Sequence, residues 1–463
     1  MQDRQIKRIL ALETPEKNIT VNGWVKTRRD SKEFTFLELN DGSCRANIQV
    51  IVEAGLPCHE TALKLTSGAA VKVAGDLVEC PPGKEQKFEV KASGITVYGE
   101  CDAEAYPIQK KKTSDEFLRT VAHLRPRTNK YAAMLRIRAE LSHAIHRYFR
   151  EEGFFYVHTP LITTSDCEGA GQMFQVTTLD IANTPKTPDG AVDYARDFFG
   201  KKTSLTVSGQ LEGEALALGL GRIYTFGPAF RAENSNTYRH CSELWMIEPE
   251  AAFFTLQDDM ELAEGFLKSI ITDVLANCPE DIELFARFVD KDLPASLSNI
   301  TENTFERLAY TDAVGILEKH NGKFENKVSW GVDLNSEHER FLVEQYFKKP
   351  VIMHNKPATV GAFYMKLNDD GKTVRGMDVL VPRIGEIIGG SERENRLGVL
   401  ERKMAGQGLS AEAYSWYADL RRFGSAPHAG FGLGFERALM LITGIANIRD
   451  VSAFPRVPGW AEF

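Results

Sequence analysis

Apolar and polar residues alternate along the first hundred positions in short runs, and each run ends at turn-forming residues. The turn signal Asn-Asp-Gly at 40–42 is one example. A hydrophobic period of two predicts β-strands, and one short helical segment at 60–66 interrupts them. The predicted strands are 19–25, 34–39, 46–50, 70–75, 87–91 and 95–97. Five or six short strands this close together indicate a small barrel.

The order of these strands, with a helix after the third, is typical of an OB-fold barrel. Barrels of that kind often bind single-stranded nucleic acid. A β-domain with a different role would show the same alternation. The pattern alone therefore leaves both interpretations open.

The pattern changes character after the predicted barrel. Segment 101–130 has little apolar periodicity and contains Pro107 and a lysine run at 110–112, which is typical of a hinge. Apolar residues then recur at helical spacing over 130–152, and Gly153 ends this run. The side chains expected to face the core are Ala133, Leu135, Ile137, Leu141, Ile145, Tyr148 and Phe149.

The remainder of the chain mixes both kinds of element. A strand is predicted at 154–157, and strands then alternate with long loops as far as residue 250. Helices are predicted at 255–280 and, as the last element, at 434–443. This order is that of an α+β protein rather than of repeated βαβ units, and it contains no Rossmann or P-loop glycine pattern.

Composition narrows the function classes. The 463 residues suffice for two or three domains, and a net charge of -8 excludes a generic basic coat for nucleic acid, so any RNA contact must be local. No apolar run approaches the roughly 20 residues that span a bilayer, and the first residues lack a secretion signal. The seven cysteines include no Cys-x-x-Cys pair. We therefore expect a cytoplasmic protein without membrane contact and without structural zinc.

Polar residues gather at a predicted hairpin. The sequence Phe-Arg-Ala-Glu at 230–233 leads from a predicted strand, 224–230, into a polar loop that ends at a second strand, 244–248. Arginine presents a planar fork to a phosphate, so Arg231 would stabilise the charge that builds on a reacting phosphorus atom. A surface loop held by ion pairs is the alternative interpretation.

Two further constellations suit a nucleotide. Asp378 and Glu386 flank a turn between apolar runs, beside a Gly-Gly pair, and two carboxylates can hold Mg²⁺ between triphosphate oxygens. Strand-end carboxylates that face solvent are the alternative. The sequence Gly-Leu-Gly-Phe-Glu-Arg at 432–437 opens the last helix, where Arg437 suits a purine or a phosphate. Glycines that only cap a helix would look the same.

Three segments together resemble a known set. The sequence Gly-Phe-Phe-Tyr-Val-His-Thr-Pro at 153–160, with 230–233 and 432–437, resembles motifs 1, 2 and 3 of the class II aminoacyl-tRNA synthetases. Nearly the whole chain is similar to the aspartyl, asparaginyl and lysyl subgroup, and the match to the bacterial asparaginyl-tRNA synthetases is close. The segments that carry it are 23–32, 121–129, 205–211, 231–237, 330–334 and 385–391.

The resemblance implies an α+β fold and a reaction. Asparagine and ATP would form asparaginyl-adenylate and pyrophosphate, and the terminal ribose hydroxyl of tRNA(Asn) would then accept the asparaginyl group. Mg²⁺ is the expected metal, and motif 1 implies a homodimer. The implied domains are a five-stranded OB-fold barrel that binds the anticodon at 1–101, a hinge at 102–129 and a class II antiparallel-sheet catalytic domain at 130–463.

The same resemblance assigns roles at the nucleotide. Arg231 would bind the α-phosphate, Glu233 would contact the ATP and the tRNA end, and Arg437 would clamp the ATP, so these three are the expected catalytic residues. The full ATP set is Arg231, Glu233, His240, Leu244, Glu386 and Arg437, and the Mg²⁺ ligands are Asp378 and Glu386. The subgroup usually carries phenylalanine at the position of Leu244, so the stacking on adenine is expected to be weaker here.

The amino-acid pocket is expected to distinguish asparagine from aspartate. Aspartyl enzymes carry a lysine where this chain has Gly213, so an aspartate side chain would lose its counter-charge. Glu248 would accept from the side-chain amide nitrogen, and Arg393 would donate to the amide oxygen. The α-amino end would be bound by Glu168 and Gln210, and Ser208 completes the predicted set.

In the barrel, Phe36 is the expected stacking platform for an anticodon base, with Arg29 and Gln49 as contacts to base edges. Pattern alone favours a core phenylalanine at position 36, and the resemblance reverses that preference.

Three other functions remain open. A non-discriminating aspartyl-tRNA synthetase is disfavoured by Gly213. A synthetase-like amino-acid ligase or amidotransferase that has lost tRNA is disfavoured by the barrel and hinge. A non-catalytic RNA-binding or signalling paralogue is disfavoured because Arg231, Glu386 and Arg437 are all retained.

Overall fold

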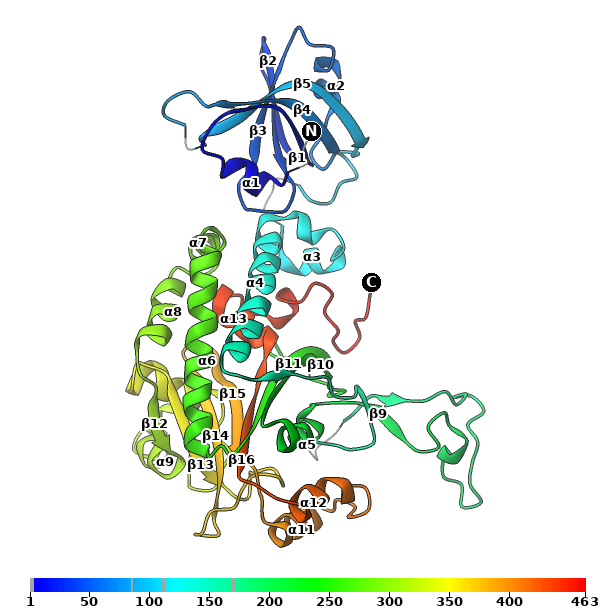
Figure 1. Ribbon diagram of the computed structural model, residues 1–463, viewed down its shortest axis with the longest axis vertical. Coiled ribbons are helices and arrows are strands. Elements are labelled where there is room, and N and C mark those ends of the chain that lie inside the picture. The colour runs from blue at the N-terminus through cyan, green and yellow to red at the C-terminus, as the bar shows by residue number, and fades with distance from the viewer. Residues whose placement is uncertain (1–3, 85, 110–112, 168–171, 236) are drawn as a thin grey trace. The chain divides into compact units, whose positions relative to one another are not determined.

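The computed structural model describes residues 4–84, 86–109, 113–167, 172–235 and 237–463. The lysine run 110–112 and the predicted ligand Glu168 lie outside the described residues. The chain divides into two compact units, Met1–Arg136 and Ile137–Phe463, and each is described by itself. Figure 1 shows the elements of both units along the chain.

The first unit contains a closed five-stranded barrel with the strand order β1-β2-β3-β5-β4. Its strands are β1 (Glu16–Asp30), β2 (Phe34–Asn40), β3 (Ile48–Glu53), β4 (Ala70–Glu79) and β5 (Phe88–Gly99). Alternate side chains such as Leu37, Leu39 and Val50 point inward and are fully buried, as a period of two requires. This confirms the predicted OB-fold barrel.

The details of the barrel differ from the pattern in two places. The predicted strands 87–91 and 95–97 are one strand, β5, whose pairing with β4 shifts register between Ala92 and Gly94. This irregularity breaks the alternation and hides the continuity of the strand. Helix α2 (His59–Lys64) lies where one was predicted, whereas the short helix α1 (Ile6–Leu10) was not predicted.

Three further helical pieces follow the barrel. Within the segment predicted as a hinge lie α3 (Asp115–Thr120) and a 3₁₀ turn, Arg125–Arg127. Ser114 caps α3 by accepting a hydrogen bond from the backbone N–H of Phe117. Helix α4 (Asn129–Glu151) matches the predicted 130–152. Its expected core positions are buried, except for two that are half-buried, Leu135 and Tyr148.

The second unit is built on an eight-stranded sheet with the order β12-β13-β14-β15-β16-β11-β10-β6. All neighbours are antiparallel except the pairs at the two edges, β12 with β13 and β6 with β10. In chain order the strands are β6 (Phe155–Tyr156), β10 (Arg222–Phe230), β11 (Glu243–Ala252), β12 (Glu306–Ala309), β13 (Val351–Pro357), β14 (Thr373–Val381), β15 (Gly385–Glu392) and β16 (His428–Gly434). The predicted hairpin and the strand after Gly153 are therefore present.

A small second sheet and the helices complete the unit (Figure 1). The small sheet joins β7 (Ile162–Thr163), β9 (Thr203–Leu205) and β8 (Gln175–Val176). The helices are α5 (Gln210–Leu220), α6 (Leu256–Asn277), α7 (Pro279–Phe288), α8 (Leu293–Glu302), α9 (Tyr310–Glu318), α10 (Ser336–Arg340), a π-helical turn (Phe341–Tyr346), α11 (Leu397–Gly406), α12 (Ser415–Arg422) and α13 (Phe435–Thr443). Among the described residues, no helix combines the length and the apolar character needed to cross a membrane.

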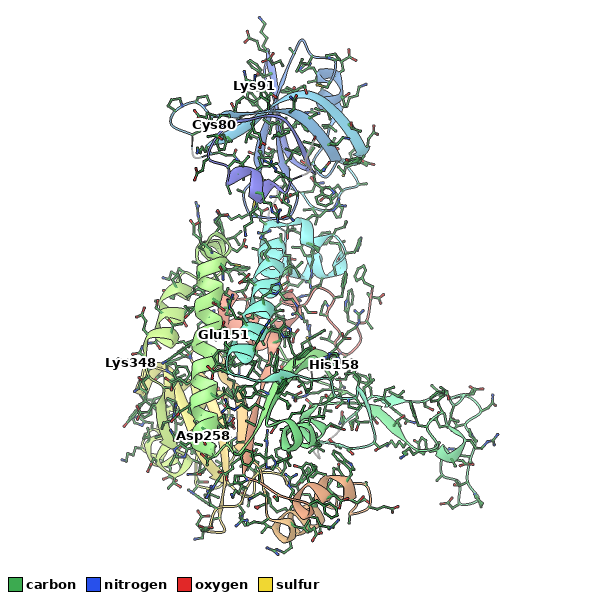
Figure 2. The ribbon with its side chains drawn as sticks, in the orientation of Figure 1. Cys80, Lys91, Glu151, His158, Asp258 and Lys348 are labelled. Carbon is green, nitrogen blue, oxygen red and sulfur yellow. The ribbon has the colours of Figure 1, made fainter. Side chains whose placement is uncertain are left out.

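Helix α6 packs against three strands at the centre of the large sheet, β14, β15 and β16. Its start is fixed by a capping box between Thr255 and Asp258, and Figure 2 labels Asp258. The helix ends at Asn277 because Pro279 cannot continue its hydrogen bonds and instead opens α7. Helix α6 thus supports the strands that present the polar side chains.

Candidate active site

One face of β11 presents alternate side chains to a cavity of 330 Å³. These are Leu244, Met246, Glu248 and Glu250, which share a face because they are two residues apart. Other residues of the wall come from α5, β13, β14, β15, β16, the hairpin loop and α13. The cavity therefore has an acidic end at Glu248 and Glu250 and a second end at the hairpin loop.

Glu248 lies on β11, and its carboxylate is held by residues just before the start of α5. Its carboxylate accepts hydrogen bonds from the backbone N–H of Gly209 at 3.1 Å, from the hydroxyl of Thr225 at 3.1 Å and from the hydroxyl of Ser208. Ser208 and Gln210 line the same cavity. The predicted residues Ser208, Gln210 and Glu248 thus meet, although Glu248 lies far from the other two in the sequence.

Arg393 pairs with an acid that was not predicted from the sequence. Its Nε donates to Glu250 Oε2 at 3.2 Å, its Nη2 contacts the other Glu250 oxygen, and its Nη1 donates to Ser391 Oγ at 2.7 Å. Burial raises the pKa of Glu250, and the arginine opposes that rise. Burial lowers the pKa of Arg393, but Glu250 raises it overall. The contacts of the guanidinium with both carboxylate oxygens identify the two buried groups as an ion pair.

A glycine makes this pairing possible. A Cβ atom at Gly430 would lie 2.3 Å from the carbonyl oxygen of Pro249 and 2.5 Å from Glu250 Cδ. The close approach of β16 to β11 at this point therefore requires glycine. The position of Glu250 two residues after Glu248 was the available signal in the sequence, since both had to face the same side of a strand.

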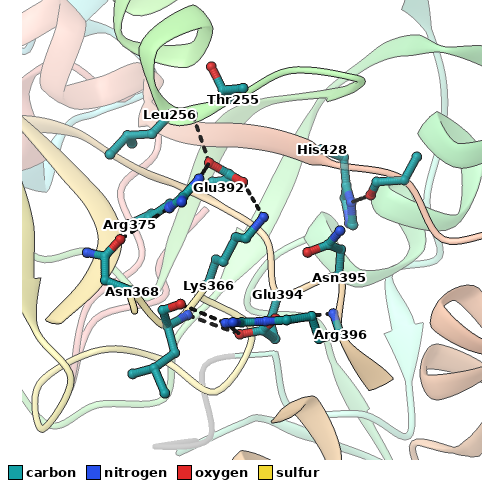
Figure 3. Close-up of polar contacts among 12 residues, drawn as sticks. Thr255, Leu256, Lys366, Asn368, Arg375, Glu392, Glu394, Asn395, Arg396 and His428 are labelled. Atoms are coloured by element: carbon teal, nitrogen blue, oxygen red, sulfur yellow. Dashed lines mark hydrogen bonds and ion pairs between the residues drawn. The ribbon is translucent and has the colours of Figure 1, made fainter. Parts of the chain in front are cut away.

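The strand end that carries Arg393 is anchored by the acids on either side of it. Glu392 is buried and contacts Lys366 Nζ at 2.7 Å, Arg375 Nη1 at 2.8 Å and the backbone N–H of Leu256 at 3.2 Å (Figure 3). Glu394 is also buried and has hydrogen bonds of its own to the chain around it. These contacts fix the backbone from which the arginine side chain reaches the cavity.

Basic side chains gather at the other end of the cavity. Arg231 follows directly on β10, Arg437 is the third residue of α13, and His240 lies in the hairpin loop. Burial and the charge of Arg437 lower the pKa of His240, so its imidazole is neutral near pH 7. Its Nδ1 lies within hydrogen-bond distance of the hydroxyls of Ser235 and Thr237, at 2.9 and 2.6 Å. This cationic end has the chemistry that binds phosphates.

Asp378 and Glu386 face each other across β14 and β15. A Cβ atom at Gly389 would lie 2.9 Å from Glu386 Oε1 and 3.8 Å from Asp378 Oδ1, so this glycine leaves room for both carboxylates. Lys356 Nζ lies 2.5 Å from Asp378 Oδ1. Burial raises the pKa of Asp378, with Glu386 adding to the rise and Lys356 opposing it. Asp378 is buried, so the solvent-facing alternative does not hold for it.

Two carboxylates at one cradle fit Mg²⁺, which typically takes one or two protein carboxylates and fills its other positions with water and phosphate oxygens. Among the described residues, no group of three potential metal-binding side chains occurs. The lysine beside Asp378 was not predicted, because a single lysine on a strand carries no local signal for this role. It compensates one of the two negative charges.

Most of the predicted residues therefore meet in one cavity. The predicted residues that line it are Ser208, Gln210, Arg231, His240, Leu244, Glu248, Asp378, Glu386, Arg393 and Arg437. Glu233 is exposed in the hairpin loop and does not belong to the lining, and Glu168 lies outside the described residues. Polar lining residues that were not predicted include Arg239, Glu250, Lys356, Tyr364 and Glu436.

Gly213 lies behind the acidic end. A side chain at this position would begin 3.6 Å from Glu250 Cγ and 3.5 Å from Ile223 Cδ1. A lysine there would therefore begin beside Glu250. With glycine in place, the charge of Arg393 is already balanced by Glu250.

The barrel brings its three predicted residues to one outer face. Arg29 and Phe36 are register partners on β1 and β2, and the guanidinium carbon of Arg29 lies 5.3 Å from the centre of the Phe36 ring. Phe36 is half-buried and points outward, so it is not a core residue. Gln49 shares this face on β3 and donates to Glu89 at 2.7 Å. An aromatic ring beside an arginine suits a stacked base.

Comparisons with known proteins match the chain in parts and as a whole. The family described as tRNA synthetases class II (D, K and N) matches residues 114–458, and the OB-fold nucleic acid binding domain matches 19–98. An asparagine–tRNA ligase of Nitratidesulfovibrio vulgaris (strain DP4) is 58% identical over 463 residues, which is 100% of both chains. That of Nostoc sp. (strain PCC 7120) is 56% identical over 464 residues, again 100% of both chains.

Solved structures agree with this match. The asparaginyl-tRNA synthetase of Pyrococcus horikoshii complexed with asparaginyl-adenylate is 32% identical, with a TM-score of 0.82 over 96% of this chain and 95% of that chain. A putative aspartyl-tRNA synthetase of Leishmania major Friedlin has a TM-score of 0.80 over 99% of this chain and 94% of that one. Its identity of 19% supports the fold alone.

Proposed function

The chain belongs to the class II tRNA synthetases of the D, K and N group, and within it to the asparagine–tRNA ligases, and from this we propose how its residues carry the reaction. The enzyme activates asparagine with ATP and transfers the asparaginyl group to tRNA(Asn), with release of AMP. The observation that carries the choice of substrate is the acidic end of the cavity, where Arg393 is already paired with Glu250.

Asparagine binds at the acidic end. Gln210 accepts from the α-ammonium group, and Glu248, oriented by Ser208, accepts from the side-chain amide nitrogen. A remaining N–H of Arg393 donates to the side-chain oxygen. Glu168 adds a further acceptor for the α-ammonium group. A neutral amide fits here because each of its donors and acceptors has a matching partner.

Aspartate is excluded by charge. Its side-chain carboxylate would face Glu248 and Glu250 in a largely buried site, and the charge of Arg393 is already compensated. Gly213 supplies no second cation. Discrimination between asparagine and aspartate therefore rests on two properties of the acidic end. It lacks net positive charge, and its polar groups fit the side-chain amide.

ATP lies at the cationic end. Arg231 stabilises the negative charge that builds at the α-phosphate when the asparagine carboxylate attacks, and Arg437 and His240 hold the outer phosphates, while Leu244 contacts the base. No side-chain nucleophile takes part, so rate enhancement comes from position and charge. Glu233, exposed on the hairpin loop, serves the tRNA end.

Mg²⁺ is proposed at Asp378 and Glu386, which share the cradle at Gly389. When bound, the metal would neutralise negative charge on the triphosphate. Lys356 already engages Asp378, so Glu386 carries the larger share of the negative charge offered to the metal.

The barrel supplies the proposed contact with tRNA. The outer face of Phe36, Arg29 and Gln49 is proposed to bind the anticodon, in the cytoplasm where tRNA is charged.

A homodimer is proposed because Phe155, Tyr156 and other apolar residues after α4 are exposed in the single chain. Sedimentation velocity at micromolar protein should give a species of twice 51.7 kDa, and a tight monomer would contradict this.

The deciding experiment is ATP–pyrophosphate exchange with each of the twenty amino acids in turn. Asparagine should drive exchange far better than aspartate at neutral pH, for the charge reason given above. Equal exchange with both amino acids would instead support a non-discriminating enzyme. Exchange with neither, in a protein that binds ATP, would refute the proposed function.

A further inference from the structure

Glu214 is a fully buried acid that none of the steps above uses. It lies on the second turn of α5, its exposed fraction is 0%, and it is not among the described residues that form the cavity wall. A buried carboxylate costs free energy unless it is paired and hydrogen-bonded. The partners of Glu214 therefore indicate what the position achieves.

One oxygen of Glu214 is held by residues of α12 and β16. Its Oε2 accepts from the hydroxyl of Tyr417 at 2.7 Å and from Arg421 Nη2 at 2.7 Å, and it lies 3.0 Å from His428 Nε2. Although burial raises the pKa of Glu214, Arg421 and His428 lower it overall, so the carboxylate is ionised. Residues of α12 and β16 thus fix its position.

The other oxygen faces the amino-acid end of the cavity. Glu214 Oε1 accepts from Gln210 Nε2 at 3.1 Å and lies 3.8 Å from Arg393 Nε. A carboxylate can only accept, so the amide NH₂ of Gln210 must point toward Glu214. The carbonyl oxygen of Gln210 is therefore turned away from Glu214, and Gln210 itself lines the cavity.

We propose that Glu214 is a positioning residue for the amino-acid substrate, because it holds the Gln210 amide with its oxygen available to the substrate's α-ammonium group. The inference rests on the proposed function, in which Gln210 binds that group. A purely structural ion pair between Glu214 and Arg421 is the competing explanation. The two differ in what happens when the shape of Glu214 is kept and its charge is removed.

Glu214→Gln makes that change. The single oxygen of the new side chain is drawn to Arg421 and Tyr417, so its NH₂ faces Gln210 and forces that amide to turn round. An NH₂ group then meets the α-ammonium group of the substrate. The KM for asparagine in pyrophosphate exchange should rise about 10- to 100-fold, as expected for loss of a hydrogen bond to a charged group. The KM for ATP should stay within about twofold.

A reciprocal swap should restore binding. In the double variant Glu214→Gln, Gln210→Glu, the carboxylate now at position 210 accepts from the NH₂ at 214 and still offers an oxygen to the ammonium group. Its KM for asparagine should return toward the wild-type value. Glu264→Gln is the matched control, since Glu264 is also an ion-paired acid, with Lys268 and Arg307, but does not form part of the cavity wall.

The outcomes separate the explanations. An unchanged KM for asparagine in folded Glu214→Gln, or an equal rise in the KM for ATP, would overturn the inference. If that variant does not fold, Glu214→Met with Arg421→Met removes both buried charges, a replacement that proteins often tolerate. The same rise in KM is expected because Gln210 has lost its acceptor, and a wild-type KM would overturn the inference. Wild-type protein without asparagine-dependent exchange would instead refute the proposed function.

Discussion

Arg231 follows directly on β10, so a strand of the central sheet fixes its backbone at the cationic end of the cavity. A guanidinium held in this way needs little reorganisation when charge builds on a phosphate. His240 differs from it because burial and Arg437 lower its pKa, so at pH 7 it contributes hydrogen bonds rather than charge. Charge and hydrogen bonding are thus divided between neighbouring residues.

Replacing Arg231 by alanine removes the donor that is proposed to act on the transition state. Adenylate formation, measured as asparagine-dependent pyrophosphate exchange, should fall about 10²- to 10³-fold. Arg222→Ala is the control, because Arg222 lies exposed at the opposite end of β10. Exchange near the wild-type rate in Arg231→Ala would contradict the proposed position of the α-phosphate.

At the scale of elements, the end of β15 fixes the backbone that carries Arg393. Glu392 holds the backbone next to Arg393 through Lys366 and Arg375 (Figure 3). Burial raises the pKa of Glu392, but its hydrogen bonds to Lys366 and Arg375 lower it overall. The carboxylate is therefore more stable as an anion in the folded protein than in the unfolded chain.

Glu392→Gln should lower the free energy of unfolding by about 2–3 kcal/mol at pH 7, because it leaves two cations with a neutral partner. Since the folded pKa lies below the unfolded one, the wild-type contribution is complete above the unfolded pKa and is lost as pH falls through the folded pKa. Urea unfolding midpoints between about pH 6 and 3 should therefore fall less steeply in the variant than in wild type. Parallel curves for the two proteins would count against this assignment.

Elements and contacts differ in how far the sequence predicts them. The barrel, the hairpin β10–β11, α4 and α13 follow from strong apolar periods and turn residues. Helices α7 and α8 were not predicted, because Pro279 and Pro294 stand at their starts and interrupt the apolar pattern. The pairing of Glu250 with Arg393 joins residues 143 positions apart, and no local period reports such a contact.

At the scale of the whole molecule, the cavity and the proposed anticodon face belong to different compact units. The described lining of the cavity comes entirely from Ile137–Phe463, whereas the face proposed to bind the anticodon belongs to Met1–Arg136. Adenylate formation is therefore expected to draw on no side chain of the barrel. Binding of tRNA, in contrast, is expected to depend on both units.

Phe36→Ala tests this division. Stacking of a base on an aromatic ring contributes about 1–3 kcal/mol, so kcat/KM for aminoacylation of tRNA(Asn) should fall about 5- to 100-fold. Pyrophosphate exchange should remain at the wild-type level. Tyr98→Ala is the control, because Tyr98 is an exposed aromatic on β5 of the same barrel. A parallel loss of both activities in Phe36→Ala would show that the barrel is not a separate reader of the anticodon.

The compensated charges around Arg393 also bear on inhibitor chemistry. A compound that mimics the adenylate would need an uncharged group, with one donor and one acceptor, at the proposed position of the asparagine side chain, because Glu250 already pairs with the arginine. An acidic isostere would leave water without gaining a counter-ion, which weakens its binding. Amide-bearing compounds should therefore select this enzyme over relatives whose pocket carries a lysine at the position of Gly213.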